Sequence, residues 1–182
     1  MTPRILSSYC LIIAALLVPR AALAQGARLQ LDHLNKLAEK ATETVDVSAD
    51  PAVLKQAAGF LAGKGSDTEK MQALLGGITG IYVKSFEFNA PNMYAESDVE
   101  VIRKQVSGSG WSRVVSVREK GELTEIYFWR DRETTGGLVV ISAETNELTV
   151  VNIVGRVDLA SLGALGPMIP KLPAALGKGT PK

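Results

Sequence analysis

The strongest constraint on the fold of this chain is a run of four β-type segments in its C-terminal half. Between residues 112 and 155, stretches rich in β-branched and aromatic residues are separated only by short turn sequences. These turns are Lys120-Gly121, the four residues from Thr134 to Gly137, and Thr145-Asn146. Connections this short join neighbouring antiparallel strands. The sequence therefore predicts an antiparallel meander, with strands near residues 112–119, 122–131, 137–145 and 147–155.

Both faces of this meander carry apolar side chains. Because side chains alternate along a strand, a two-residue turn at Lys120-Gly121 separates the first hairpin into two sets. One face of this hairpin then carries Val115, Ile126 and Phe128, and the other carries Val114, Tyr127 and Trp129. In the second hairpin, one side carries Leu138, Val140, Val151 and Ile153, and the other carries Val139, Ile141, Leu148 and Val150. A sheet with one solvated face would instead alternate cleanly between apolar and polar residues. We therefore expect both faces to be covered.

The N-terminal half shows mainly helical patterns. Apolar residues from Leu31 through Leu37 to Val45 follow helical spacing, although the short stretch Thr44 to Val47 also fits a strand. Asp50 before Pro51 indicates the start of a helix that runs to Leu61. Two further helices are predicted from capping-box patterns, and a long strand is predicted between them. The first of these helices starts at Ser66 with Glu69, the strand starts at Ile78, and the second helix starts at Ser97 with Glu100.

Together these patterns predict an α+β fold. Helices come mostly first and antiparallel strands last, an order typical of helices packed on one face of a sheet. We expect about five strands, four of them in the meander. The expected organisation is a leader over residues 1–24, one domain over residues 25–165, and a loosely ordered tail rich in Pro and Gly over residues 166–182.

The first 24 residues have the composition of a cleavable secretory signal. Arg4 supplies a basic start, an apolar run extends from Cys10 to Val18, and Ala22-Leu23-Ala24 has the small-x-small pattern that signal peptidase recognises. The apolar run is too short to cross about 30 Å of hydrocarbon. We therefore predict cleavage between Ala24 and Gln25, a periplasmic or secreted mature protein, and no stable membrane anchor.

Composition narrows the chemistry of the mature chain. Cys10 is the only cysteine and leaves with the leader, so neither a disulfide nor a thiolate site is expected. Loss of Arg4 and Arg20 changes the formal net charge from +1 to −1. A near-neutral chain of mixed charges gives no indication of binding to nucleic acid. We expect a possible envelope protein or peptide as partner, and no nucleic acid.

No motif in the chain predicts a catalytic, cofactor or metal site. The only histidine, His33, has no nucleophile beside it in the sequence and is expected to lie on the polar side of the first helix. Glu96, Asp98 and Glu100 form the best local carboxylate cluster. In the first turn of a helix these charges complement the helix dipole, so we expect them to be structural.

Two surfaces remain as candidates for function. Tyr127, Trp129 and Val150 share one sheet face and are a candidate interaction surface, because aromatic side chains dominate interface energetics. The alternative is that helices cover this face. Arg130, Arg132 and Glu133 lie in the most polar connection of the meander and are a candidate polar loop, where an enzyme or small-ligand site could assemble in three dimensions.

The mature chain resembles a family of exported bacterial proteins, domain of unknown function 4252. The resemblance extends from about Leu29 to about Leu165. It is carried by Leu31-Asp32-His33-Leu34, Ile81-Tyr82-Val83, Trp111, and the segment from Gly155 through Asp158-Leu159. It implies export and an uncharacterised role, with weak support for a regulatory one. Many members look like lipoproteins, and this chain departs from them because it has no cysteine placed for lipidation.

These observations favour an exported, non-enzymatic module that binds a protein or peptide through its sheet. The support comes from the apolar sheet faces and from the lack of a nucleophile, metal or nucleotide motif. The alternative is a small-ligand carrier or an enzyme whose polar residues converge near Arg130, Arg132 and Glu133. A third reading is a structural domain whose sheet is fully covered by helices.

Overall fold

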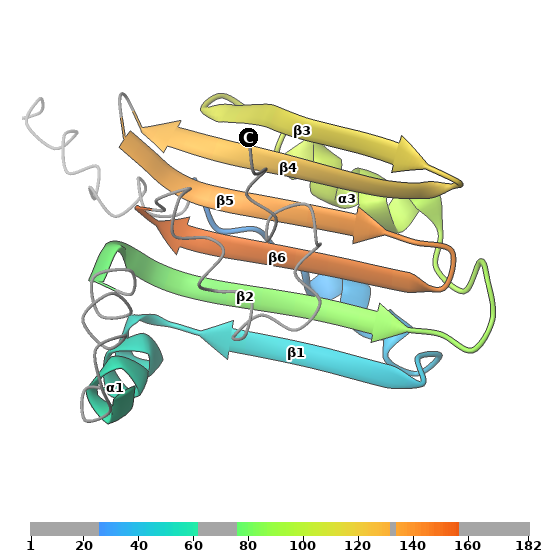
Figure 1. The fold of residues 1–182 in the computed structure, drawn as a ribbon, viewed down its shortest axis with the longest axis horizontal. Coiled ribbons are helices and arrows are strands. Elements are labelled where there is room, and N and C mark those ends of the chain that lie inside the picture. The colour runs from blue at the N-terminus through green and yellow to red at the C-terminus, as the bar shows by residue number, and fades with distance from the viewer. Residues whose placement is uncertain (1–25, 62–75, 132–133, 157–182) are drawn as a thin grey trace, which may run out of the picture.

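The computed structural model describes residues 26–61, 76–131 and 134–156 and contains a six-stranded antiparallel sheet (Figure 1). In spatial order the strands are β1 (Glu43–Ala49), β2 (Ile78–Glu87), β6 (Glu147–Gly155), β5 (Thr134–Ala143), β4 (Glu122–Asp131) and β3 (Trp111–Glu119). The helices are the 3₁₀ helix η2 (Asp32–Leu37) and the α-helices α1 (Pro51–Leu61) and α3 (Glu96–Gln105). The predicted α+β class is confirmed, with six strands instead of about five.

The predicted meander is confirmed, except that β5 begins at Thr134, inside the predicted connection from Thr134 to Gly137, and ends at Ala143 instead of residue 145. Lys120 and Gly121 have φ angles of 50° and 90°, as a two-residue type I′ turn requires, and Glu119 pairs with Glu122 beside that turn. β6 follows β5 in the meander and pairs with β2 on its other side. The last strand of the meander therefore lies in the middle of the sheet.

The sheet has a core on each face, as predicted. The first face carries Tyr127, Val139, Ile141 and Val150 and packs against buried residues of η2 and α3. Figure 1 shows both helices behind the sheet. The second face carries Ile126, Phe128, Leu138, Val140, Val151 and Ile153 and packs with Leu54 of α1. Both sets match the predicted alternation.

A bulge in β3 departs from the simple alternation. Arg113 pairs with Tyr127 and Val115 pairs with Ile126, so Val114 has no partner of its own on β4. An extra residue of this kind interrupts the regular alternation of side chains along the strand. Val114 is consequently half exposed instead of sharing the core with Tyr127.

The predicted helix from Leu31 to Val45 is wrong beyond Leu37. Only Asp32–Leu37 is helical, as η2, and the chain enters strand β1 at Glu43. Thr44, Val45 and Val47 are β-branched and pair with β2, with Val45 opposite Ser85. Pairing with a long neighbouring strand outweighs the helical spacing of the apolar residues here. The alternative interpretation of Thr44 to Val47 as a strand is confirmed.

The sequence predicted the start of α1 correctly and the start of α3 incorrectly. Asp50 caps α1 as predicted, since its Oδ1 accepts the N–H groups of Ala52 and Val53, both at 2.9 Å. α3 begins at Glu96, and Asp98, not Glu100, accepts the Ala95 N–H at 3.0 Å. The predicted capping box at Ser97 and Glu100 is therefore wrong by two residues.

An extended segment before η2 lies across the first face of the sheet and is held there by two side-chain amides. Buried Asn152 on β6 accepts the Leu29 N–H and donates to the Ala27 carbonyl, both at 2.9 Å. Gln105 of α3 accepts the Gln30 N–H at 2.8 Å and donates to the Gln30 carbonyl at 2.9 Å. Each amide thus makes a bidentate contact with the backbone of this segment.

Four predictions fall outside the described residues. These are the leader over residues 1–24, the helix starting at Ser66, the helical turn after Asp158 and the tail over residues 166–182. Within the described ranges, no helix combines the length and apolar character needed to cross a membrane.

Candidate functional site

The three residues of the predicted interaction surface lie on the face that the helices cover. Tyr127 is 7% exposed and Val150 is fully buried, and both belong to the same core as residues of η2 and α3. Of the two alternatives left by the sequence, the structure shows the helix-covered one for these two residues. Only Trp129 keeps a partly exposed side chain.

Trp129 occupies a recess lined by glycines. A Cβ atom added to Gly26, Gly110 or Gly136 would lie 2.6–2.9 Å from its indole ring, closer than real Cβ contacts. Trp111 stands directly opposite on β3 and is also half-buried. The two tryptophans of the chain therefore occupy directly paired positions on neighbouring strands.

The predicted polar loop is described only in part. Arg130 is exposed, and its backbone N–H donates to the Gly110 carbonyl at 2.8 Å. Arg132 and Glu133 lie outside the described residues. Among the described residues, no carboxylate is recorded in an ion pair with Arg130.

The acidic residues at the start of α3 pair with basic side chains. Arg103 binds Glu96 at 2.5 Å and also Glu100, and Lys36 of η2 binds Asp98 at 2.7 Å. His33 lies beside them, with Nε2 3.1 Å from the Asp98 carbonyl. In the described part of the chain, no three His, Cys, Asp or Glu side chains are grouped as a metal site would need.

We expect Asp98→Ala to lower the free energy of unfolding by about 1 kcal/mol, because the start of α3 would lose the hydrogen bond that the Ala95 N–H donates to the Asp98 side chain. Burial raises the pKa of Asp98, but hydrogen bonds from Lys36 and the Ala95 N–H outweigh it and lower the pKa overall. Urea unfolding at neutral pH measures the loss. Asp98→Asn, which keeps an acceptor for the Ala95 N–H, should lose less; an equal loss would contradict the capping role.

A buried carboxylate on β4, which the sequence analysis missed, is joined through Arg103 to the acidic residues of α3. Glu125 has a side chain only 4% exposed, and it accepts hydrogen bonds from Arg103 of α3 at 2.8 Å and Arg113 of β3 at 2.9 Å. Burial raises the pKa of Glu125, but the two guanidinium groups outweigh this effect and lower it. The strand pattern could have identified this residue, because Glu125 lies between Leu123 and Tyr127 in the predicted alternation and therefore faces the core.

A polar groove lies between the extended N-terminal segment and strands β1 and β2. Its volume is about 340 Å³. The Arg28 guanidinium lies 4.4 Å from the centre of the Tyr82 ring, and Lys84 bonds to Asp46 at 2.5 Å and to Asn35 at 2.7 Å. Because Lys84 already has these partners and the lining mixes both charges, the groove favours no particular ligand class.

Among the described elements, strand β3 combines an unpaired edge with exposed apolar and basic side chains. It is nine residues long and forms one edge of the sheet, paired with β4 on one side only. Val114 and Val117 are 49% and 48% exposed, and Arg118 is also exposed. An edge strand of this length offers unpaired backbone groups for pairing with another chain.

Comparison with known proteins identifies one family. The family model described as "Domain of unknown function (DUF4252)" matches residues 38–165, which is most of the chain. Comparisons with curated proteins and with solved structures give no match.

Proposed function

We propose that this chain, which belongs to the domain of unknown function DUF4252 family, binds an extended acidic segment of a partner protein by adding it to the sheet beside β3. The observation that carries the proposal is an edge strand of nine residues with exposed valines and arginines. Strand addition of this type draws affinity from main-chain hydrogen bonds and specificity from alternate side chains.

The register of the β3–β4 hairpin identifies which backbone groups of β3 point outward. Residues that flank a two-residue turn exchange hydrogen bonds, and the next pair along an antiparallel ladder does not. Glu119 flanks the turn, so the N–H groups of Arg118 and Ser116 point away from β4. These two residues supply the outward donors to which an added strand would pair.

The side chains of β3 favour a partner that is acidic and partly apolar. Arg113 and Arg118 belong to the strand and Lys120 follows it, whereas Glu119 is the only acidic residue among them. Arg113 is bonded to Glu125 but keeps about half of its side chain exposed. Val114 and Val117 add apolar surface between these charges. An alternating acidic and apolar segment complements this pattern.

The same charges disfavour a second copy of the chain as the partner. In an antiparallel β3–β3 pair centred on Ser116, with Val114 and Val115 taking one place at the bulge, Arg113 of each copy would oppose Arg118 of the other. Like charges directly opposite each other destabilise a strand pair. A bulge at Val114 further disturbs extended self-pairing.

We also propose that this binding takes place outside the cytoplasm. The support is the leader over residues 1–24 together with the position of its predicted cleavage site. The first backbone groups anchored by Asn152 belong to Ala27 and Leu29, just beyond a cut between Ala24 and Gln25. Cleavage there would remove the leader and leave the anchored segment whole.

We expect a blocked peptide of the same length as β3, alternating valine with glutamate, to bind the chain that starts at Gln25. NMR titration should shift the amide signals of β3 more than those of β1. Ser116→Pro removes an outward N–H from an exposed residue and should weaken binding on the order of tenfold or more. Ser116→Ala keeps that N–H and should bind as the parent chain does.

A peptide that alternates valine with lysine distinguishes recognition of charge from nonspecific binding. Equal affinity for both peptides, or unchanged binding by Ser116→Pro, would contradict the proposal. Circular dichroism of each variant confirms that the sheet is intact. Analytical ultracentrifugation tests the competing occupant: a dimer abolished by Ser116→Pro, with no peptide binding, would assign the edge to a second copy.

A further inference from the structure

The side chains on the second face of the sheet are more deeply buried than the described elements packed against that face can explain. Leu138, Val140, Val151 and Ile153, at the centre of this face on β5 and β6, each have 0% exposure. Among the described residues, their core contains one helical residue, Leu54 of α1. η2 and α3 belong to the core on the opposite face.

Helix α1 does not reach the centre of this face. Its main contacts with strands are to β1 and β2, at one edge of the sheet. Figure 1 shows it beside the ends of those two strands. Among the described elements, none therefore lies over β5 and β4 on the second face.

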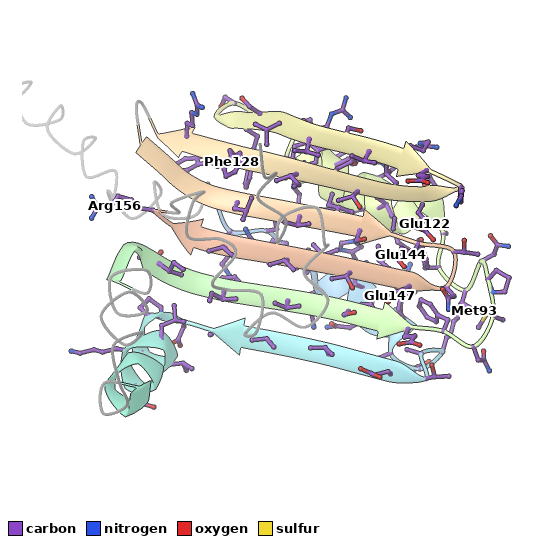
Figure 2. All side chains as sticks on the ribbon, in the orientation of Figure 1. Met93, Glu122, Phe128, Glu144, Glu147 and Arg156 are labelled. Carbon is purple, nitrogen blue, oxygen red and sulfur yellow. The ribbon has the colours of Figure 1, made fainter. Side chains whose placement is uncertain are left out.

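The apolar part of the second face lies next to the point where the chain leaves β6. Ile153 pairs with Leu138, and two residues earlier Val151 pairs with Val140. The next row is polar: Thr149 pairs with both Ser85 and Ser142, and its hydroxyl lies 2.7 Å from that of Ser85. The apolar rows thus occupy the end of the sheet near Phe128 and Arg156, whereas Glu144 and Glu147 lie at the opposite end (Figure 2).

The exit from β6 is held in a fixed geometry at this apolar end. Gly155 has φ 119°, a conformation that favours glycine, and a Cβ there would lie 2.3 Å from the Gly77 carbonyl oxygen. The Arg156 N–H donates to the same carbonyl at 2.7 Å. The chain consequently continues from the central strand, beside the apolar rows.

We infer that residues 157–165 fold back over the second face and cover β5 and β6. The segment carries Val157, Leu159, Leu162 and Leu165, the last three at helical spacing. A helix of nine residues is about 13 Å long, and four residues of a strand extend over roughly 14 Å, so such a helix would cover about four strand residues. The match to the family model also continues to residue 165, beyond the end of β6.

The other long segment outside the described ranges suits this position less well. Residues 62–75 connect α1 to β2, so both of their ends are tied to the β1 edge. The first nine residues of this segment include six charged or hydroxyl side chains and two glycines, and leucine and methionine occur only at Met71, Leu74 and Leu75. We therefore assign the cover of the second face to the segment after β6.

A thiol crosslink tests this placement in the chain from Gln25 to Lys182, which lacks cysteine. The double variant Val151→Cys with Leu162→Cys should form an intramolecular bridge with dibromobimane, detected by mass spectrometry. Val150→Cys with Leu162→Cys is the matched control, because neighbouring residues of a strand face opposite sides. We expect the first pair to crosslink on the order of tenfold faster than the second.

Equal rates for the two pairs, or no bridge in either, would overturn the inference. A faster bridge between Val151→Cys and Leu74→Cys would assign the cover to residues 62–75. An intermolecular bridge would assign it to a second copy and would equally contradict the proposal.

A second measurement does not depend on crosslink geometry. The thiol of Val151→Cys should react slowly with maleimide in an otherwise unchanged chain and on the order of tenfold faster when Leu159→Asp and Leu162→Asp are added. Leu176→Asp makes a similar change outside the segment and should leave the rate unchanged. The inference fails if the two aspartate changes in the segment have no more effect than Leu176→Asp. Circular dichroism establishes that each variant retains its sheet.

Discussion

Replacing Asn152 with alanine is expected to lower the free energy of unfolding by about 3 kcal/mol. Asn152 is fully buried, and its amide serves three backbone groups: the Leu29 N–H, the Ala27 carbonyl and, at 3.3 Å, the Leu138 carbonyl. Alanine would leave the first two without this partner in a buried setting. The extended N-terminal segment should detach, and proteolysis near Leu29 should accelerate.

Gln105 supplies the matched control for this prediction. It makes the same bidentate contact with the backbone of Gln30, but at an exposed position where water can replace it. We therefore expect Gln105→Ala to cost only about 1 kcal/mol. Urea unfolding of both variants gives the comparison, and similar losses at the two positions would contradict the role assigned to burial.

Removal of Arg103 should have the second largest effect, a loss of about 2–3 kcal/mol at neutral pH. The substitution Arg103→Ala leaves the buried Glu125 carboxylate with Arg113 alone, because Arg103 donates the 2.8 Å hydrogen bond from α3. The cost arises because the buried carboxylate is then only partly compensated, by the single guanidinium of Arg113. Arg118→Ala, an exposed arginine on β3, should cost much less and is the control.

The pH dependence of stability provides an independent check on the same contact. Because the pKa of Glu125 is lower in the folded chain than its ordinary value of 4.5, its contribution is fully present above that value. The contribution is lost as the pH falls through the lower folded pKa. Without Arg103 the folded pKa of Glu125 rises toward its ordinary value, so Arg103→Ala should lose less stability on acidification than the parent chain, and the difference in stability between the two should shrink as the pH falls.

A double variant distinguishes the cost of an unpaired charge from a cost of lost packing. Arg103→Met with Glu125→Leu removes both charges and keeps similar volumes, and such replacements are often neutral for buried pairs. We expect this variant to recover most of the stability lost in Arg103→Ala. A loss as large as that of the single variant would show that the ion pair itself stabilises the fold.

The sheet was predictable because strand patterns are local. Turn residues such as Lys120-Gly121 locate a hairpin, and the period of two then assigns every side chain to a face without knowledge of the rest of the molecule. This is why Tyr127 and Phe128 were assigned to opposite faces correctly. The same argument cannot say which of two apolar faces the helices cover, and the candidate surface at Tyr127 and Val150 depended on that choice.

The remaining differences arise from contacts between distant residues. Val45 fits a helical stripe in sequence, yet its β-branched neighbourhood pairs with β2, some 40 residues later. Asp98 is favoured over Glu100 as the cap because Lys36 of η2 binds it from outside the helix. Glu125 tolerates burial only because α3 brings Arg103 to it. None of these partners is adjacent in sequence, so local patterns could not supply them.

The central position of β6 also sets an order for folding. β1 and β2 pair with each other, and β3 to β5 form their own meander, but β6 alone joins the two groups through β2 and β5. The anchor for Leu29, Asn152, belongs to this same strand, 123 residues later in the chain. During synthesis from the N-terminus, the two halves of the sheet would remain separate until residues 147–155 have emerged. Closure of the domain therefore depends on contacts of long sequence separation, which is expected to make it slow.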